Sequence, residues 1–182
     1  MLHRDEYMAL RNASDMDLLD EFTGDMMNRL STELLELGVR FPIIKSGARG
    51  YYVRTPGREV LETMGKAKPV DMAGFENREF WHPAFYCPVP PNATGSGDAS
   101  IAGFLSAYLR GLPLLDCVIV ATCTGSASVE KPDALTGVPD WDGVQERIQS
   151  IPRDPLEVEG EGWYRDAEND FLWVGPADQS EK

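Results

Sequence analysis

The sequence predicts a single α/β domain, because helical and strand-like segments alternate within 182 residues. Apolar side chains recur every three or four positions between residues 26 and 37, which is the spacing of a helix with one buried face, and Gly38 provides its stop. Short apolar runs at 39–45 and 51–54 are typical of strands that flank a glycine turn. Pro42 lacks a backbone donor, so the first strand is expected at a sheet edge or with an irregularity.

The remaining elements follow from the same patterns of spacing and of Gly and Pro positions. Residues 64–80 are mixed in character and are expected to be rich in loops. From residue 151 onward the chain is acidic and rich in Gly and Pro, with a frayed end expected. The expected helices are 3–11, 15–22, 97–110 and 114–129, the expected strands are 58–63 and 84–89, and a hairpin is expected over 162–174.

Charge, hydropathy and cysteine content indicate which partners and which compartment to expect. The net charge is −13, from 30 acidic and 17 basic residues, which argues against nucleic acid or an anionic membrane surface as a partner. No apolar stretch is long enough to span a membrane, and the charged start is unlike a signal peptide. Three cysteines without metal-type spacing, Cys87, Cys117 and Cys123, indicate reduced thiols in a cytoplasmic protein.

The segment with the strongest chemical signal is Asn92-Ala-Thr-Gly-Ser-Gly-Asp98, which leads directly into the apolar run 99–109. Gly95 and Gly97 permit a tight turn, and the helix expected after them places backbone N–H groups where an anion binds. Asp98 beside such a site is suited to take a proton from a hydroxyl while the amides stabilise a transferring phosphoryl group. The alternative is that Asp98 is an ordinary acid in the first turn of a helix.

Three segments in the right order resemble the PfkB, or ribokinase-like, carbohydrate kinases. Residues 92–105 resemble that family's second signature, Asp-Thr-x-Gly-Ala-Gly-Asp-x-Phe-x-x-Gly-Phe. Residues 43–53 resemble its strand and Gly-x-x-Gly turn along the nucleotide phosphates, and residues 115–129 its helix beside the adenine pocket. The resemblance covers roughly residues 37 to 148.

The resemblance implies the C-terminal part of a ribokinase-like doubly wound sheet, without the N-terminal sugar-binding strands and the lid. It divides the chain into a partial kinase domain, 1–150, and an acidic C-terminal extension, 151–182. A homo-oligomer or a missing N-terminal half is therefore expected as a partner, and a truncated reading frame stays open as an alternative. Apolar surface is expected to be partly exposed at Ile43, Ile44, Phe85 and Tyr86, and along 114–129.

The activity implied by the resemblance is phosphoryl transfer from ATP, with Mg²⁺, to a hydroxyl of a sugar or nucleoside-like acceptor. Asp98 is then the catalytic base, and Gly95, Ser96 and Gly97 supply the amides of the anion hole. The rival interpretation is a non-catalytic nucleotide-binding or interaction remnant of such a kinase. The magnesium ligands are left open, because Asn12-Ala-Ser-Asp15 only loosely resembles the family's Asn-x-x-Glu element and also fits a helix cap.

The same resemblance implies a set of ligand-binding residues, several of which have a plain structural alternative. Lys45 and Arg49 fit equally well as solvated surface cations. Thr122 is expected within a helix, where a threonine hydroxyl often bonds its own backbone. A packed tryptophan is the commoner outcome at an aromatic cluster. The implied nucleotide residues are Lys45, Ser46, Gly47, Arg49, Gly50 and Thr122, and the implied acceptor residues are Trp81 and His82.

Overall fold

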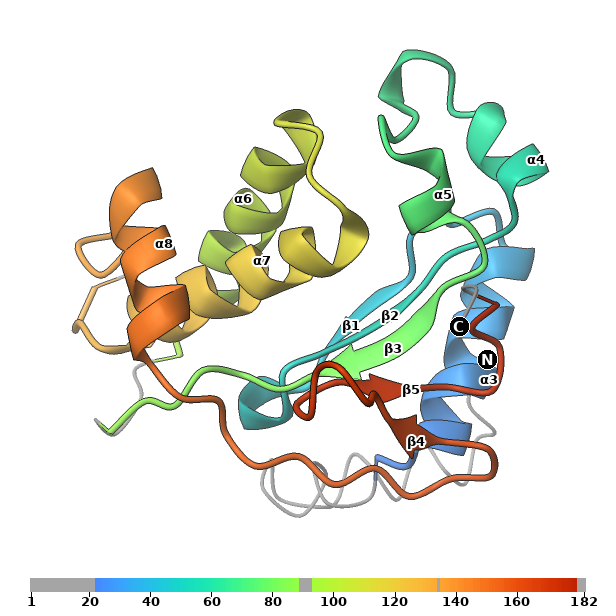
Figure 1. Cartoon of the computed structure of the whole chain (residues 1–182). Helices are drawn as coiled ribbons and strands as arrows, with labels where there is room; N and C mark the ends of the chain where they lie inside the picture. The colour runs from blue at the N-terminus through green and yellow to red at the C-terminus, as the bar shows by residue number, and fades with distance from the viewer. Residues whose placement is uncertain (1–21, 89–92, 134, 180–182) are drawn as a thin grey trace.

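The protein folds around one five-stranded antiparallel sheet (Figure 1). The computed structural model describes residues 22–88, 93–133 and 135–179, so the helix expected at 3–11, nearly all of the one at 15–22 and the last three residues lie outside the described part. The strand order is β1-β2-β3-β5-β4, and every pairing is antiparallel. The strands are β1 (Ile43–Lys45), β2 (Tyr51–Arg54), β3 (Glu79–His82), β4 (Tyr164–Arg165) and β5 (Trp173–Val174).

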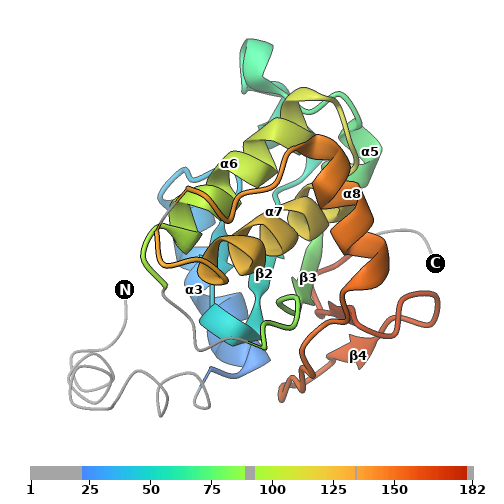
Figure 2. The ribbon, with the colours of Figure 1, turned by 90° about the vertical axis from the view of Figure 1, so that its left-hand side faces the viewer.

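Helices cover both faces of this sheet. Figures 1 and 2 both show α6 and α7 side by side above one face, with α8 across them, and α3 on the opposite face. Among the described residues, no helix is long and apolar enough to cross a membrane. The α-helices are α3 (Gly24–Glu36), α4 (Arg58–Glu62), α5 (Met72–Phe75), α6 (Ser96–Leu109), α7 (Leu114–Val129) and α8 (Trp141–Ser150), and short 3-10 turns are η1 (Gly47–Arg49) and η2 (Gly65–Ala67).

Strand β2 separates two hydrophobic cores, because successive side chains of a strand point to opposite faces. Tyr51 and Val53 belong to the core under α6 and α7. Tyr52 belongs to the smaller core on the α3 side, where it packs with Met27 and Trp81. The register of β2 against β3, with Tyr51 opposite His82 and Tyr52 opposite Trp81, therefore decides which side chains face the helices that carry the Gly-rich motif.

The turn between β1 and β2 is held close to the end of β3 by Gly50. Its φ is +79°, a conformation that side chains rarely adopt, and a Cβ there would stand 2.1 Å from the carbonyl oxygen of His82. Above the sheet, Gly103 of α6 packs closely against α7, where a Cβ would stand 2.7 Å from Thr124 Oγ1. These two close approaches fix the turn against β3 and the two helices against each other.

The helix expected at 26–37 forms as α3, and the two expected at about 97–110 and 114–129 form as α6 and α7. The edge position expected from Pro42 is also confirmed, since β1 is the first strand of the described sheet. The hairpin expected over 162–174 is present as β4 and β5.

Two expected strands are wrong. Residues 58–62 form α4 instead. Arg and Glu favour a helix, and only Leu61 is fully buried, so the segment lacks the alternating burial of a strand. The strand expected at 84–89 lies earlier, as β3. Beyond β3 the amide of Phe85 donates to Ser126 Oγ at 3.2 Å and that of Tyr86 to the Pro152 carbonyl at 2.9 Å, so these donors serve α7 and the segment after α8.

The expected exposure of apolar surface is also partly wrong. Phe85 is 1% exposed and α7 is buried along most of its length, because α6, α8 and the sheet surround it. Tyr86 is exposed as expected, and Ile43 and Ile44 are half-buried. The antiparallel pairing differs from the mostly parallel sheet of a doubly wound fold, although helices do lie on both faces.

Candidate active site

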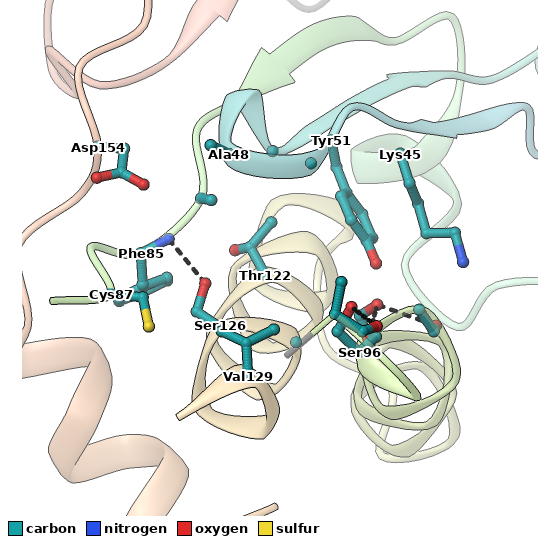
Figure 3. Close-up of a pocket in the computed structure, with 17 residues that line it drawn as sticks. Lys45, Ala48, Tyr51, Phe85, Cys87, Ser96, Thr122, Ser126, Val129 and Asp154 are labelled. Carbon is teal, nitrogen blue, oxygen red and sulfur yellow. Dashed lines mark hydrogen bonds between the residues drawn. The ribbon is translucent and has the colours of Figure 1, made fainter. Parts of the chain in front are cut away.

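A cavity of about 540 Å³ lies between the η1 turn and the helices α6 and α7 (Figure 3). Its walls come from five places: the η1 turn with the adjoining ends of β1 and β2, the segment after β3, the start of α6, one face of α7, and the segment after α8. Its lining is mainly small or apolar; Lys45, Tyr51 and Ser96 gather at α6, and Thr122, Ser126 and Asp154 add polar groups elsewhere. A pocket of this size with a few convergent polar groups is typical of a small-molecule site.

The first turn of α6 forms one end of the cavity. Gly95 caps the helix with φ +81°, the left-handed conformation that the Gly-rich motif makes available. The Ser96 amide donates to the Ala93 carbonyl at 3.2 Å, so it is a weaker candidate for the anion hole than the sequence suggested. The amides of Gly97 and of Asp98 itself lie in the first helical turn, where an α-helix offers no internal acceptor.

Lys45 stands directly over this helix end. Its Nζ would be 2.6 Å from a Cβ built on Gly97, so the absence of a side chain at Gly97 is what lets the ammonium approach the backbone. No carboxylate pairs with Lys45 within the described segments. A cation and the amides of a helix N-terminus therefore converge on one point, and both favour an anion there.

Asp98 is exposed in the same helical turn and does not line the cavity. Gly97 lines the cavity, and the carboxylate of the next residue, Asp98, lies outside it. The Asp98 side chain is therefore accessible to a solute outside the cavity. It is compatible with a general base that acts at the mouth of an anion site.

The β1–β2 turn supplies small residues to the opposite wall. Gly47, Ala48 and Gly50 line the cavity, so the backbone of the turn borders it directly. Ser46 does not line it: the residue is 1% exposed, and its hydroxyl has no hydrogen-bond partner in the described part of the chain. The Ser46 amide donates to the Gly50 carbonyl at 2.8 Å, which closes the turn.

Arg49 and Trp81 lie on the other face of the sheet and do not reach the cavity. The Arg49 guanidinium donates to the carbonyls of Phe22 at 2.7 Å and Glu157 at 2.9 Å, and it stacks over the Trp81 ring at 4.6 Å. Trp81 is fully buried, and its indole N–H donates to the Arg49 carbonyl at 2.8 Å. Nucleotide binding by Arg49 and acceptor binding by Trp81 are therefore corrected to packing roles in the α3-side core.

His82 and Thr122 meet between β3 and α7. His82 is 1% exposed and does not line the cavity; burial first, and the charge of Arg153 second, lower the pKa of its imidazole to about 3. Its Nδ1 lies 3.4 Å from Thr122 Oγ1. Thr122 lines the cavity, but its hydroxyl lies 3.0 Å from the Val118 carbonyl, the backbone bonding that the sequence left open. The placement of His82 argues for a structural group and against an acceptor ligand.

Sequence reasoning missed most of the wall that α7 contributes. Gly125, Ser126 and Val129 line the cavity together with Thr122. These positions have the i, i+3, i+4 and i+7 spacing of one helix face, so the run of small residues on α7 was a usable signal. Asp154 also lines the cavity, and burial raises the pKa of its carboxyl group. It arrives from the segment after α8, and no sequence pattern indicated that placement.

Comparison with known proteins shows the family of this chain. A model described as pfkB family carbohydrate kinase matches residues 12–141. A nucleoside kinase of Methanocaldococcus jannaschii is 45% identical over 56 residues, which are 31% of this chain and 18% of that protein. An uncharacterized sugar kinase of Archaeoglobus fulgidus is 27% identical over 145 residues, which cover 72% of this chain and 50% of that protein. The chain thus spans at most half the length of these relatives.

Solved structures share the fold. The crystal structure of the M. jannaschii nucleoside kinase matches with a TM-score of 0.51 at 22% identity, over 78% of this chain and 45% of that one. Arabidopsis thaliana ribokinase, solved with ribose and ATP, matches with a TM-score of 0.55 at 19% identity, over 70% of this chain and 35% of that one. The resemblance seen in the sequence is therefore confirmed, and the chain belongs to the pfkB family of carbohydrate kinases.

Proposed function

We propose that this chain carries the ATP site and the catalytic base of a kinase that phosphorylates a hydroxyl of a sugar or nucleoside. One observation carries the proposal: Lys45 Nζ and the first-turn amides of α6 converge at one end of the cavity, and Asp98 stands exposed beside them. Phosphoryl transfer needs little beyond such positioning and charge stabilisation. The names of the two relatives, a nucleoside kinase and an uncharacterized sugar kinase, support the acceptor class.

The cavity has a natural polarity for ATP. Its charged end at Lys45 and α6 suits the phosphates. Its other end, between the small η1 turn and the α7 face, is lined mainly by small residues, together with Thr122 and Ser126 of α7 and the carboxyl group of Asp154. We assign the nucleoside to that end, because a flat base fits between two walls built from small residues.

In the proposed reaction Asp98 takes the proton of the acceptor hydroxyl as its oxygen attacks the γ-phosphorus. The bond between that phosphorus and the β–γ bridging oxygen breaks, and ADP leaves with the electron pair. Lys45 and the Gly97 and Asp98 amides hold the negative charge that develops. The described residues contain no group of three His, Cys, Asp or Glu side chains placed to hold a metal ion. Mg²⁺ bound with ATP would supply further positive charge for the transferring phosphoryl group.

The second candidate is a nucleotide-binding module without turnover. The observation that favours it is the exposure of Asp98. The described residues enclose the cavity assigned to the nucleotide, whereas Asp98 is exposed to solvent. The two candidates agree on ATP binding and differ on phosphoryl transfer.

The deciding experiment measures ATP binding by calorimetry and phosphoryl transfer to a panel of sugars and nucleosides. Asp98→Asn is expected to lower kcat by about 10²- to 10⁴-fold while leaving the Kd for ATP unchanged. The matched control is Asp116→Asn, because Asp116 is also an exposed acid in the first turn of a helix, α7. ATP binding without turnover by the wild type supports the module, and near-normal kcat in the asparagine variant refutes the role of Asp98.

A further inference from the structure

Tyr51 brings a hydroxyl to the charged end of the cavity. It is the first residue of β2, directly after Gly50, and it lines the cavity. Only 7% of the residue is exposed. Figure 3 shows its ring descending from the η1 turn toward Ser96 on the first turn of α6, alongside Lys45.

This hydroxyl makes no hydrogen bond with any residue that the structure describes. Ser100 lies near it, but the Ser100 hydroxyl donates its single proton to the carbonyls of Ser96 at 2.8 Å and Gly97 at 3.0 Å, so this proton does not serve the Tyr51 oxygen. Burial raises the pKa of Tyr51, and the nearby Ser100 acts in the opposite direction with a smaller effect. The phenol therefore stays protonated at neutral pH, and its O–H forms no hydrogen bond with the described residues, which is costly in a buried site unless a ligand accepts it.

The neighbouring tyrosine shows what a satisfied hydroxyl looks like in the same strand. Tyr52, on the opposite face, donates to Glu79 Oε1 at 2.7 Å and lies 2.7 Å from Ser31 Oγ. The Glu79 carboxylate also accepts from Asn28 Nδ2 at 2.8 Å and from the Ala177 amide at 2.7 Å. Tyr52 is thus paired within a buried network, whereas Tyr51 is an exception that points at the proposed anion site.

We propose that the Tyr51 hydroxyl donates a hydrogen bond to a phosphate oxygen of the bound nucleotide. This inference rests on the proposed function, because the phosphate is the group that the α6 amides and Lys45 would hold. The ligand class is a nucleoside di- or triphosphate. Three kinds of donor then surround the phosphate end: first-turn amides, one ammonium and one neutral phenol.

The test compares the full chain with Tyr51→Phe by calorimetry, using ATP, ADP and adenosine. Because a hydrogen bond to a charged group is lost, the Kd for ATP and ADP is expected to rise about tenfold to a hundredfold, while the Kd for adenosine stays the same. Without ligand, the melting temperature is expected to stay level or rise by about 2–4 °C, since an unpartnered hydroxyl is removed. A purely structural role for the hydroxyl predicts a fall instead.

The matched control is Tyr52→Phe, which removes a paired hydroxyl from the other face. It is expected to lower the melting temperature and leave the Kd for ATP unchanged. ATP binding that Tyr51→Phe leaves unaltered, or a loss of equal size for adenosine, overturns the role of Tyr51 alone. A wild-type chain that binds neither ATP nor ADP overturns the proposed function, and the role of Tyr51 with it.

Discussion

His82 makes the stability of this protein depend on pH. Burial between β3 and α7 holds the pKa of its imidazole at about 3, against 6.5 for an unperturbed histidine. Below pH 6.5 His82 is protonated in the unfolded chain but stays neutral in the native state. The contribution of His82 to the free energy of unfolding is therefore present above pH 6.5 and is lost as the pH falls toward 3. The two pKa values limit the whole effect to about 5 kcal/mol, of which about 2 kcal/mol falls between pH 7 and pH 5.

The assay is urea unfolding followed by tryptophan fluorescence at pH 5, 6, 7 and 8. His82→Gln removes the titration while keeping a polar side chain beside Thr122, so the variant is expected to lose about 2 kcal/mol less than the wild type between pH 7 and pH 5. Acidic groups act equally in both proteins and cancel in this difference. His3→Gln is the matched control, because His3 is the other histidine of the chain. Equal pH slopes for wild type and His82→Gln refute the buried, neutral imidazole.

Two further predictions concern the turn and its cations. Gly50→Ala places a Cβ 2.1 Å from the His82 carbonyl at φ +79°, and it is expected to lower the free energy of unfolding by more than about 3 kcal/mol; a loss below about 1 kcal/mol in urea unfolding contradicts this close approach. Lys45→Met is expected to weaken ATP binding about tenfold or more, whereas Arg49→Ala lowers the melting temperature and leaves the Kd for ATP unchanged; a larger loss of ATP affinity in Arg49→Ala reverses the assignment of the two cations.

The sequence predicts the backbone of the candidate site better than its side chains. The Gly-rich motif and the apolar run after it predict a helix from about residue 97, and α6 begins at Ser96, because glycine conformation and helical spacing are local properties. For the same reason Gly47 and Gly50 are found in a turn that borders the cavity. Both features depend on the backbone conformation of a few consecutive residues, which the local sequence restricts.

Which side chains face the cavity depends on pairing between distant segments. Tyr51 and Tyr52 are indistinguishable in the sequence, and only the register of β2 against β3 assigns one to each core. Arg49 and Trp81 fall on the α3 side for the same reason. Asp154 reaches the cavity because its amide donates to the Ala84 carbonyl at 2.8 Å, a contact between segments far apart in the chain. No local pattern encodes such contacts.

The helix at 141–150 was missed although its signals are local. Asp140 caps it by accepting from the Gly143 amide at 2.9 Å, and Trp141, Val144 and Ile148 share one face. Its cap and its apolar spacing are both visible in the sequence. The strand expected at 58–63 failed for a different reason, since a short run does not distinguish a strand from a short helix. The strand expected at 84–89 failed because the backbone amides of Phe85 and Tyr86 donate to α7 and to the segment after α8.

The most direct test of the account is a crystal structure of the chain with ADP and Mg²⁺. The account predicts that the phosphates lie within hydrogen-bonding distance of the Gly97 and Asp98 amides and of Lys45 Nζ. It also predicts that the base lies between the η1 turn and the α7 face that carries Ser126. A nucleotide bound elsewhere, or one whose phosphates point away from the first turn of α6, contradicts the central claim that this cavity is the ATP site.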